Sequence, residues 1–134
     1  MRSIALIAHD AKKHELMEVV RPWRALLAPH RLVATEHTGM LLEETLALSV
    51  SKVLSGPRGG DLQIGAWVAT GEISAVIFLR DPLTAHPHEL DFSAALKVCD
   101  VHNVPLATKE ATASLLLRSY VSEVEERQAG SSAF

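Results

Sequence analysis

Several features that mark large classes of protein are scarce in this chain. It has one cysteine in 134 residues, so no internal disulfide can form, and we expect a reducing, cytoplasmic location. Aromatic residues make up only 4% of the chain, and its net charge is −3 with both signs interspersed. A nucleic-acid-binding role therefore has little support, because basic stripes interleaved with aromatic residues are missing. The first apolar run, Ser3 to Ala8, is too short for a signal peptide or a membrane span.

Patterns of metal ligands are scarce as well. His86 and His88 stand two residues apart and His9 lies near His14, but no cysteine pair, HExxH motif or acidic ligand loop accompanies them. We therefore expect no metal site.

What the chain does contain is a regular alternation of short apolar runs with longer segments of helical spacing. The runs are Ile4–Ala8, Leu32–Thr35, Lys52–Leu54, Ala75–Leu79 and Pro105–Ala107. The helical segments are Lys12–Leu27, Gly39–Leu48, Leu62–Thr70, Asp91–His102 and Ala111–Tyr120. The first and fourth runs are continuously apolar, which is typical of strands covered on both faces. The alternation predicts repeated βα units and a parallel, doubly wound α/β sheet.

The chain is short enough to form a single domain, which we place at residues 1–124. Pro22 is expected to kink or split the first helix. Residues 125–134 begin charged and become rich in glycine and serine, so we expect a flexible C-terminal tail.

Polar residues gather directly after the predicted strands. They occur in His9-Asp10, in residues 35–39, in residues 55–61, in Arg80-Asp81-Pro82 and in residues 86–91. In a parallel sheet these segments all emerge at the carboxyl edge, where open α/β sheets bind their ligands. Together they predict a site for a small anion.

The segment from Leu54 to Gly65 has the strongest local signal. It turns through Gly56, Gly59 and Gly60 and enters a helical segment with Asp61 at its start. Glycines let backbone N–H groups converge, and the first N–H groups of a helix lack internal partners, so the segment resembles an anion cradle with a carboxylate beside it. The alternative is a tight turn in which Asp61 is only the helix N-cap.

These residues also carry a resemblance to a known family. The segments in question read IALIAHDAKK, LVATEHTG, LSGPRGGDLQIGA, VIFLRDPLTAHPHELD and NVPLAT. In order and spacing they resemble methylglyoxal synthase, over about Ile4 to Thr112. The resemblance implies a three-layer α/β/α fold with a five-stranded parallel sheet of order 3-2-1-4-5, and a homohexamer. It implies a lyase that converts dihydroxyacetone phosphate to methylglyoxal and inorganic phosphate without a cofactor.

The resemblance also implies roles for particular residues. Asp61 matches the catalytic base, and His88 matches a histidine at the substrate carbonyl, although alone it could be an exposed loop residue. Asp91 could fix the tautomer of His88 or cap the next helix. Asp10 falls in the catalytic pocket, or else caps the end of a strand. The predicted substrate and phosphate contacts are His9, Lys13, Thr35, Glu36, His37, Thr38, Ser55, Gly56 and Gly60.

One segment departs from the family pattern. The family commonly has ATGTTG where this chain has ATEHTG, so Glu36 replaces a glycine and His37 replaces a threonine. A glycine lost from a position with positive φ would strain the turn, and an inward carboxylate would repel a phosphate dianion. We therefore expect Glu36 to point outward while its backbone N–H still faces the phosphate.

Two other functions remain open at this point. The regulatory domain of carbamoyl phosphate synthetase and a domain of inosinicase share the expected fold, so a non-catalytic ligand sensor is the alternative. A sensor needs the phosphate contacts but no base, and the presence of Asp61, His88, Asp10 and Asp91 together favours the enzyme. A purely structural assembly subunit would leave the polar segments unexplained.

Overall fold

The computed structural model describes residues 3–83 and 92–132, with side chains placed up to residue 122 apart from that of Pro57. The strands are β1 (Ser3–Ala8), β2 (Arg31–Thr35), β3 (Val50–Val53), β4 (Ile73–Leu79) and β5 (Leu106–Ala107). The helices are α1 (Lys13–Val20), α2 (Arg24–Leu27), α3 (Glu36–Leu46), α4 (Gly60–Ala69), α5 (Phe92–His102) and α6 (Glu110–Ser132). Three short 3-10 turns, η1 (Asp10–Lys12), η2 (Arg21–Trp23) and η3 (Gly56–Arg58), join them.

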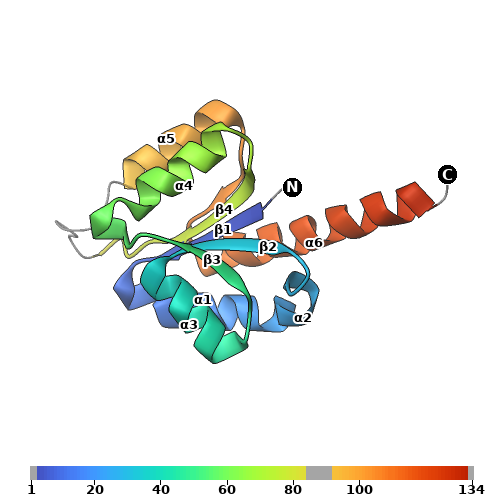
Figure 1. Cartoon of the computed structure of the whole chain (residues 1–134), viewed down its shortest axis with the longest axis horizontal. Helices are drawn as coiled ribbons and strands as arrows, with labels where there is room; N and C mark the ends of the chain where they lie inside the picture. The colour runs from blue at the N-terminus through green and yellow to red at the C-terminus, as the bar shows by residue number, and fades with distance from the viewer. Residues whose placement is uncertain (1–2, 84–91, 133–134) are drawn as a thin grey trace.

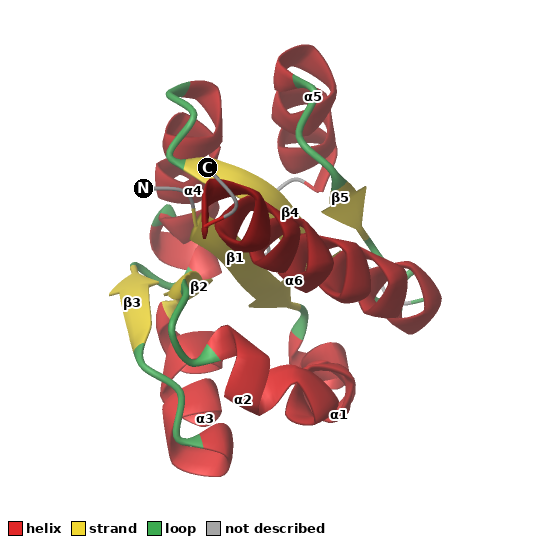
Figure 2. Cartoon of the chain, turned by 90° about the vertical axis from the view of Figure 1, so that its right-hand side faces the viewer, coloured by secondary structure: helices red, strands yellow, loops and turns green. Residues whose placement is uncertain are grey.

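The strands form one parallel sheet of order β3-β2-β1-β4-β5, as predicted. Helices α4 and α5 lie on one face, and α1, α2 and α3 lie on the other (Figure 1). The start of α6 packs on the same face of the sheet as α1, where Ala113, Leu117 and Val121 join the core. Figure 2 shows the same three layers from the side. The predicted α/β/α architecture is confirmed.

Side chains of β1 alternate between two cores, one on each face of the sheet. Ile4, Leu6 and Ala8 belong to the core under α1, α3 and α6, whereas Ala5 and Ile7 belong to the core under α4 and α5. This alternation follows from the two-residue period of a strand, and it explains why the run is apolar throughout. Both cores end at the carboxyl edge, so the polar segments that follow the strands are held by packed strands beneath them.

Helix boundaries differ from the predicted ones in informative ways. Pro22 does split the first helical segment, because η2 separates α1 from α2. Helices α3 and α4 begin earlier than their apolar spacing indicates, at Glu36 and Gly60. Helix α6 runs through Ser132 and extends beyond the body of the molecule (Figure 1). Helix-favouring residues continue past the packed part, so the segment predicted as a tail has a helical backbone, and its flexibility stays a prediction.

Cys99 lies on the buried side of α5, within the core, with 1% of its surface exposed. Burial raises the pKa of its thiol to about 11, and the nearby carboxylate of Asp100 adds to the effect. It is therefore an inert core thiol. None of the helices in the described ranges is long and apolar enough to cross a membrane.

Candidate active site

Buried polar side chains gather at the carboxyl edge of the sheet. Five polar residues are buried among those the structure describes, and four of them lie at the end of a strand or within three residues after it: His9, Thr35, Thr38 and Ser55. The strand ends pair in parallel register, with Ala8 beside Leu79 and Thr35 beside Val53, so these side chains share one edge. Buried polar groups need partners, and this edge therefore has the composition of a ligand site.

The glycine-rich segment after β3 closes tightly upon itself. The carbonyl of Ser55 accepts hydrogen bonds from the N–H groups of Arg58 and Gly60, both at 3.0 Å. Gly59 has φ +102°, a left-handed conformation that favours glycine. Gly60 lies so close to the end of β3 that an added Cβ would sit 1.7 Å from the carbonyl oxygen of Leu54. The start of α4 is thus held directly against the strand end.

Asp61 is the second residue of α4, and Gly59 is the N-cap. The alternative in which Asp61 caps the helix is therefore wrong. Its side chain is half-buried, with the Oδ1 atom fully covered. The first turn of a helix favours a negative charge, so the fold places the Asp61 carboxylate beside the glycine loop at a position that suits its charged form.

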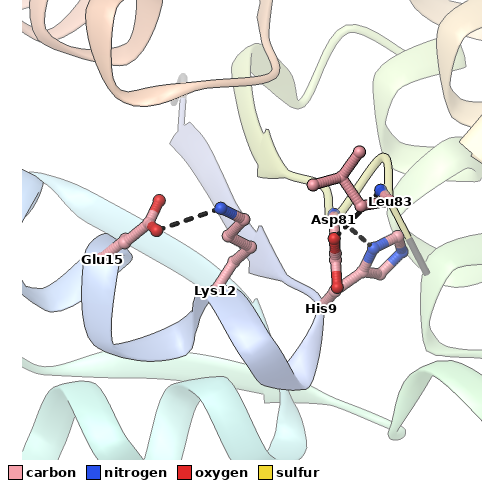
Figure 3. A network of polar contacts seen from close by, with 5 residues as sticks. All are labelled: His9, Lys12, Glu15, Asp81 and Leu83. Carbon is pink, nitrogen blue, oxygen red and sulfur yellow. Dashed lines mark hydrogen bonds and ion pairs between the residues drawn. The ribbon is translucent and has the colours of Figure 1, made fainter.

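The imidazole of His9 is bound by the segment that follows β4. Its Nδ1 atom accepts a hydrogen bond from the backbone N–H of Asp81 at 2.9 Å (Figure 3). An N–H group can donate only to a lone pair, so Nδ1 is unprotonated and Nε2 carries the proton of the neutral ring. Asp81 follows β4, and sequence analysis assigns it no role. Its position in the Arg80-Asp81-Pro82 segment after the fourth strand is the signal that could have found it.

Two neighbouring lysines after β1 have different partners. The Nζ atom of Lys13 forms an ion pair with the carboxylate of Asp10, which is 85% exposed. Lys12 binds Glu15 at 3.0 Å (Figure 3), and that hydrogen bond raises the pKa of Lys12. The start of α1 therefore carries the Lys13–Asp10 pair at the carboxyl edge, while Lys12 is engaged along the helix.

The start of α3 supplies hydroxyl and backbone donors. Thr35 ends β2 and caps the helix, and its hydroxyl lies 3.4 Å from that of Thr38. Glu36 is the first helical residue and is half-buried, whereas His37 is exposed. Positive φ occurs at Ala47 and Asn103 but at no other non-glycine residue in the described ranges. The strain expected from replacing glycine by Glu36 therefore does not arise, because the position is helical.

The described part of the site combines donors and a base. Helices α3 and α4 both begin at the carboxyl edge, where their first N–H groups and dipoles favour anions. Lys13 and the buried hydroxyls add cationic and neutral donors at the same edge. Such a set can hold an anionic group of a ligand while the Asp61 carboxylate takes a proton from another part of the same ligand. Two predicted site residues, His88 and Asp91, lie outside the described residues.

Comparison with known proteins decides the family. The family model described as MGS-like domain matches residues 15–108. A methylglyoxal synthase of Carboxydothermus hydrogenoformans is 56% identical over 119 residues, which are 89% of this chain and 98% of the relative. The chain belongs to the methylglyoxal synthase family.

Further members agree in sequence and in structure. The methylglyoxal synthase of Moorella thermoacetica is 53% identical over 126 residues, covering 94% of this chain and 98% of that protein. The crystal structure of methylglyoxal synthase from Elizabethkingia anophelis superposes with a TM-score of 0.82 at 45% identity, over 86% of this chain and 76% of that one. The resemblance stated from the sequence motifs is thus confirmed for family and fold.

Proposed function

We propose that this chain is a carbon–oxygen lyase that converts dihydroxyacetone phosphate to methylglyoxal and inorganic phosphate. The observation that carries the proposal is the place of Asp61 in the first turn of α4, directly after the closed glycine segment and at the edge where the polar side chains are buried. Membership of the methylglyoxal synthase family supports the same activity. A sensor of phosphate would have no need of that carboxylate.

In the proposed reaction the Asp61 carboxylate removes a proton from the hydroxymethyl carbon beside the substrate carbonyl. The electron pair of the broken C–H bond forms an enediolate, whose negative oxygen needs hydrogen-bond donors. Collapse of the enediolate breaks the C–O bond to phosphate, which takes the electron pair of that bond and the proton of the remaining substrate hydroxyl and leaves as the hydrogen phosphate dianion. The enolate that remains takes up a proton at its methylene carbon from the protonated Asp61, which yields methylglyoxal and restores the carboxylate. A carboxylate is a weak base for this proton, so a covered site and a strongly stabilised oxyanion are required.

Phosphate is assigned to the donors around the starts of the helices. Lys13 supplies charge, and Thr35, Thr38 and Ser55 supply hydroxyls. Gly56 at the start of the glycine segment supplies a backbone N–H, because the N–H groups of Arg58, Gly59 and Gly60 donate to carbonyls within that segment. Holding the phosphate here would place the breaking C–O bond out of the enediolate plane, which elimination requires. The family resemblance assigns His88 to the carbonyl and Asp91 to its orientation, and places Asp10 in the pocket.

The test is incubation of the purified protein with dihydroxyacetone phosphate, with methylglyoxal and phosphate measured in parallel. We expect the two products in equal amounts without added cofactor. If the protein binds phosphate but forms no methylglyoxal above background, it is a sensor and the proposed activity is wrong.

Glu36 gives a separate prediction on phosphate affinity. Its half-buried carboxylate begins α3, next to Thr35 and the proposed phosphate position. Removing one negative charge near a dianion should tighten binding, so we expect Glu36→Gln to lower the Kd for inorganic phosphate by about twofold to fivefold. Calorimetry measures this directly. Glu44→Gln, an exposed position on the same helix, should leave the Kd unchanged, and weaker binding in Glu36→Gln would contradict the proposal.

We also propose a cytoplasmic homohexamer, on the resemblance to the family. Exposed apolar side chains support association, since Leu62 on α4 and Val101 on α5 are 65% and 67% exposed. Sedimentation equilibrium should give six times the chain mass, and a monomer at micromolar concentration would contradict this assembly.

A further inference from the structure

The imidazole of His9 stands at one end of a continuous stack of side chains. Its ring meets that of Phe78 edge-on, with centroids 5.2 Å apart and planes at 86°. Phe78 in turn meets Phe92 at 5.4 Å and 89°. The guanidinium carbon of Arg80 lies 4.4 Å from the centroid of Phe92. We call Phe78, Phe92 and Arg80 the aromatic stack.

Together with His9, the aromatic stack links the end of β1 to the end of β4 and to the start of α5. Phe78 belongs to β4 and is buried with 4% exposure, while Phe92 is the first residue of α5 and is half-buried. Aromatic rings prefer such edge-to-face pairs, and the guanidinium of Arg80 is attracted to the face of the Phe92 ring. Phe78 therefore cannot turn without disturbing Phe92, and it presents a fixed surface to His9.

A second set of contacts fixes the donor that faces His9. The backbone N–H of His9 binds the carbonyl of Leu79 at 3.0 Å, which anchors the start of the side chain to β4. The carboxylate of Asp81 accepts the N–H of Leu83 at 3.1 Å, so the turn that presents the Asp81 N–H is itself closed (Figure 3). With the anchor and the donor both fixed, the remaining freedom of His9 is the rotation of its ring.

We propose that Phe78 is a positioning residue that removes this freedom. Supported by Phe92 and Arg80, it keeps the imidazole of His9 in the plane where Nδ1 accepts the Asp81 N–H and Nε2 donates. A rotated ring would lose the hydrogen bond to Asp81, and the proton could then reside on either nitrogen. An aliphatic side chain of similar volume would fill the core but would not hold the ring edge-on.

The consequence for catalysis rests on the proposed function. A neutral imidazole with its proton fixed on Nε2 is a donor of constant direction, which stabilises a developing oxyanion better than a ring that samples several orientations. The tautomer itself is a property of the protein without substrate. It can therefore be tested whether or not the chain makes methylglyoxal.

The experiment is nitrogen-15 NMR of the His9 side chain in the ligand-free protein, with Phe78→Leu as the test variant. We expect a single tautomer in the parent protein, protonated on Nε2. In Phe78→Leu the nitrogen-15 chemical shifts of the two His9 ring nitrogens should move toward a common value. The amide resonance of Asp81 should also change as its hydrogen bond to His9 weakens. We also expect kcat to fall about tenfold with KM changed less than twofold.

Val76→Ala is the matched control. Val76 lies on the same strand and in the same core, with 1% exposure, but it belongs to neither the stack nor the turn. It should lose stability while keeping the tautomer and kcat. If Phe78→Leu keeps the parent tautomer and amide resonance, or if Val76→Ala changes them equally, the proposal is overturned.

A second variant covers the case in which Phe78→Leu does not fold. Phe92→Leu alters the half-buried end of the aromatic stack without emptying the core. Mixing of the two His9 tautomers in this variant supports the proposal, and an unchanged tautomer overturns it. If the parent protein forms no methylglyoxal, the proposed function fails while the NMR result still decides the role of Phe78.

Discussion

Replacing Asp61 by asparagine should lower kcat for methylglyoxal formation by about 10² to 10⁴, the range expected for loss of a positioned base. Asparagine keeps the size of the side chain and one of its two acceptor oxygens, but it cannot accept the substrate proton. Its place in the first turn of α4 is retained, so the glycine segment should be undisturbed. Steady-state kinetics measures the loss, and calorimetry should show phosphate binding within about threefold of the parent value.

Asp100→Asn serves as the control for removal of a carboxylate. Asp100 is exposed on α5, and its replacement should leave both kcat and phosphate binding unchanged. If Asp61→Asn loses phosphate binding in parallel with turnover, the carboxylate has a structural role. Turnover near the parent value would exclude Asp61 as the base.

Gly60→Ala should have the second large effect, on both folding and activity. Its Cβ would sit 1.7 Å from the Leu54 carbonyl oxygen and 3.1 Å from that of Ser55. Both atoms belong to the backbone, so relief requires the start of α4 to move away from β3. We expect the free energy of unfolding to fall by about 3 kcal/mol, which urea titration measures, and kcat to fall with the displacement of Asp61.

Gly65→Ala is the matched control within the same helix. An added Cβ at Gly65 has no atom within 4 Å, and alanine in a helix interior is more stable than glycine by about 0.5–1 kcal/mol. The two substitutions should therefore change stability in opposite directions. Equal stability of Gly60→Ala and the parent protein would show that the glycine segment is looser than the close approach indicates.

The sheet could be predicted because its signal is local. The central strands are short apolar runs, and runs such as Ile4–Ala8 are apolar on both faces because both are covered by helices. The starts of α3 and α4 were predicted too late, because apolar spacing reports where a helix begins to pack. The structure shows that these helices begin at their caps, Thr35 and Gly59, next to the strand ends.

The site could be predicted only in part. The end-of-strand rule placed Thr35, Thr38, Ser55 and His9 at one edge, where all four prove to be buried. The contact of His9 with Phe78 and Asp81 could not be predicted, because it joins strands about 70 residues apart and depends on how two rings pack. The helical conformation of Glu36 is likewise a property of the Thr35 cap. The family pattern, which has glycine there, does not reveal it.

The most direct test of the proposed chemistry is a crystal structure of the Asp61→Asn protein with dihydroxyacetone phosphate bound. We expect the side chain of residue 61 within about 3–3.5 Å of the hydroxymethyl carbon, with the phosphate against Lys13, Ser55 and the start of α3. Substrate bound at the carboxyl edge with residue 61 turned away from that carbon, or bound elsewhere on the molecule, would contradict the assignment of Asp61 as the base.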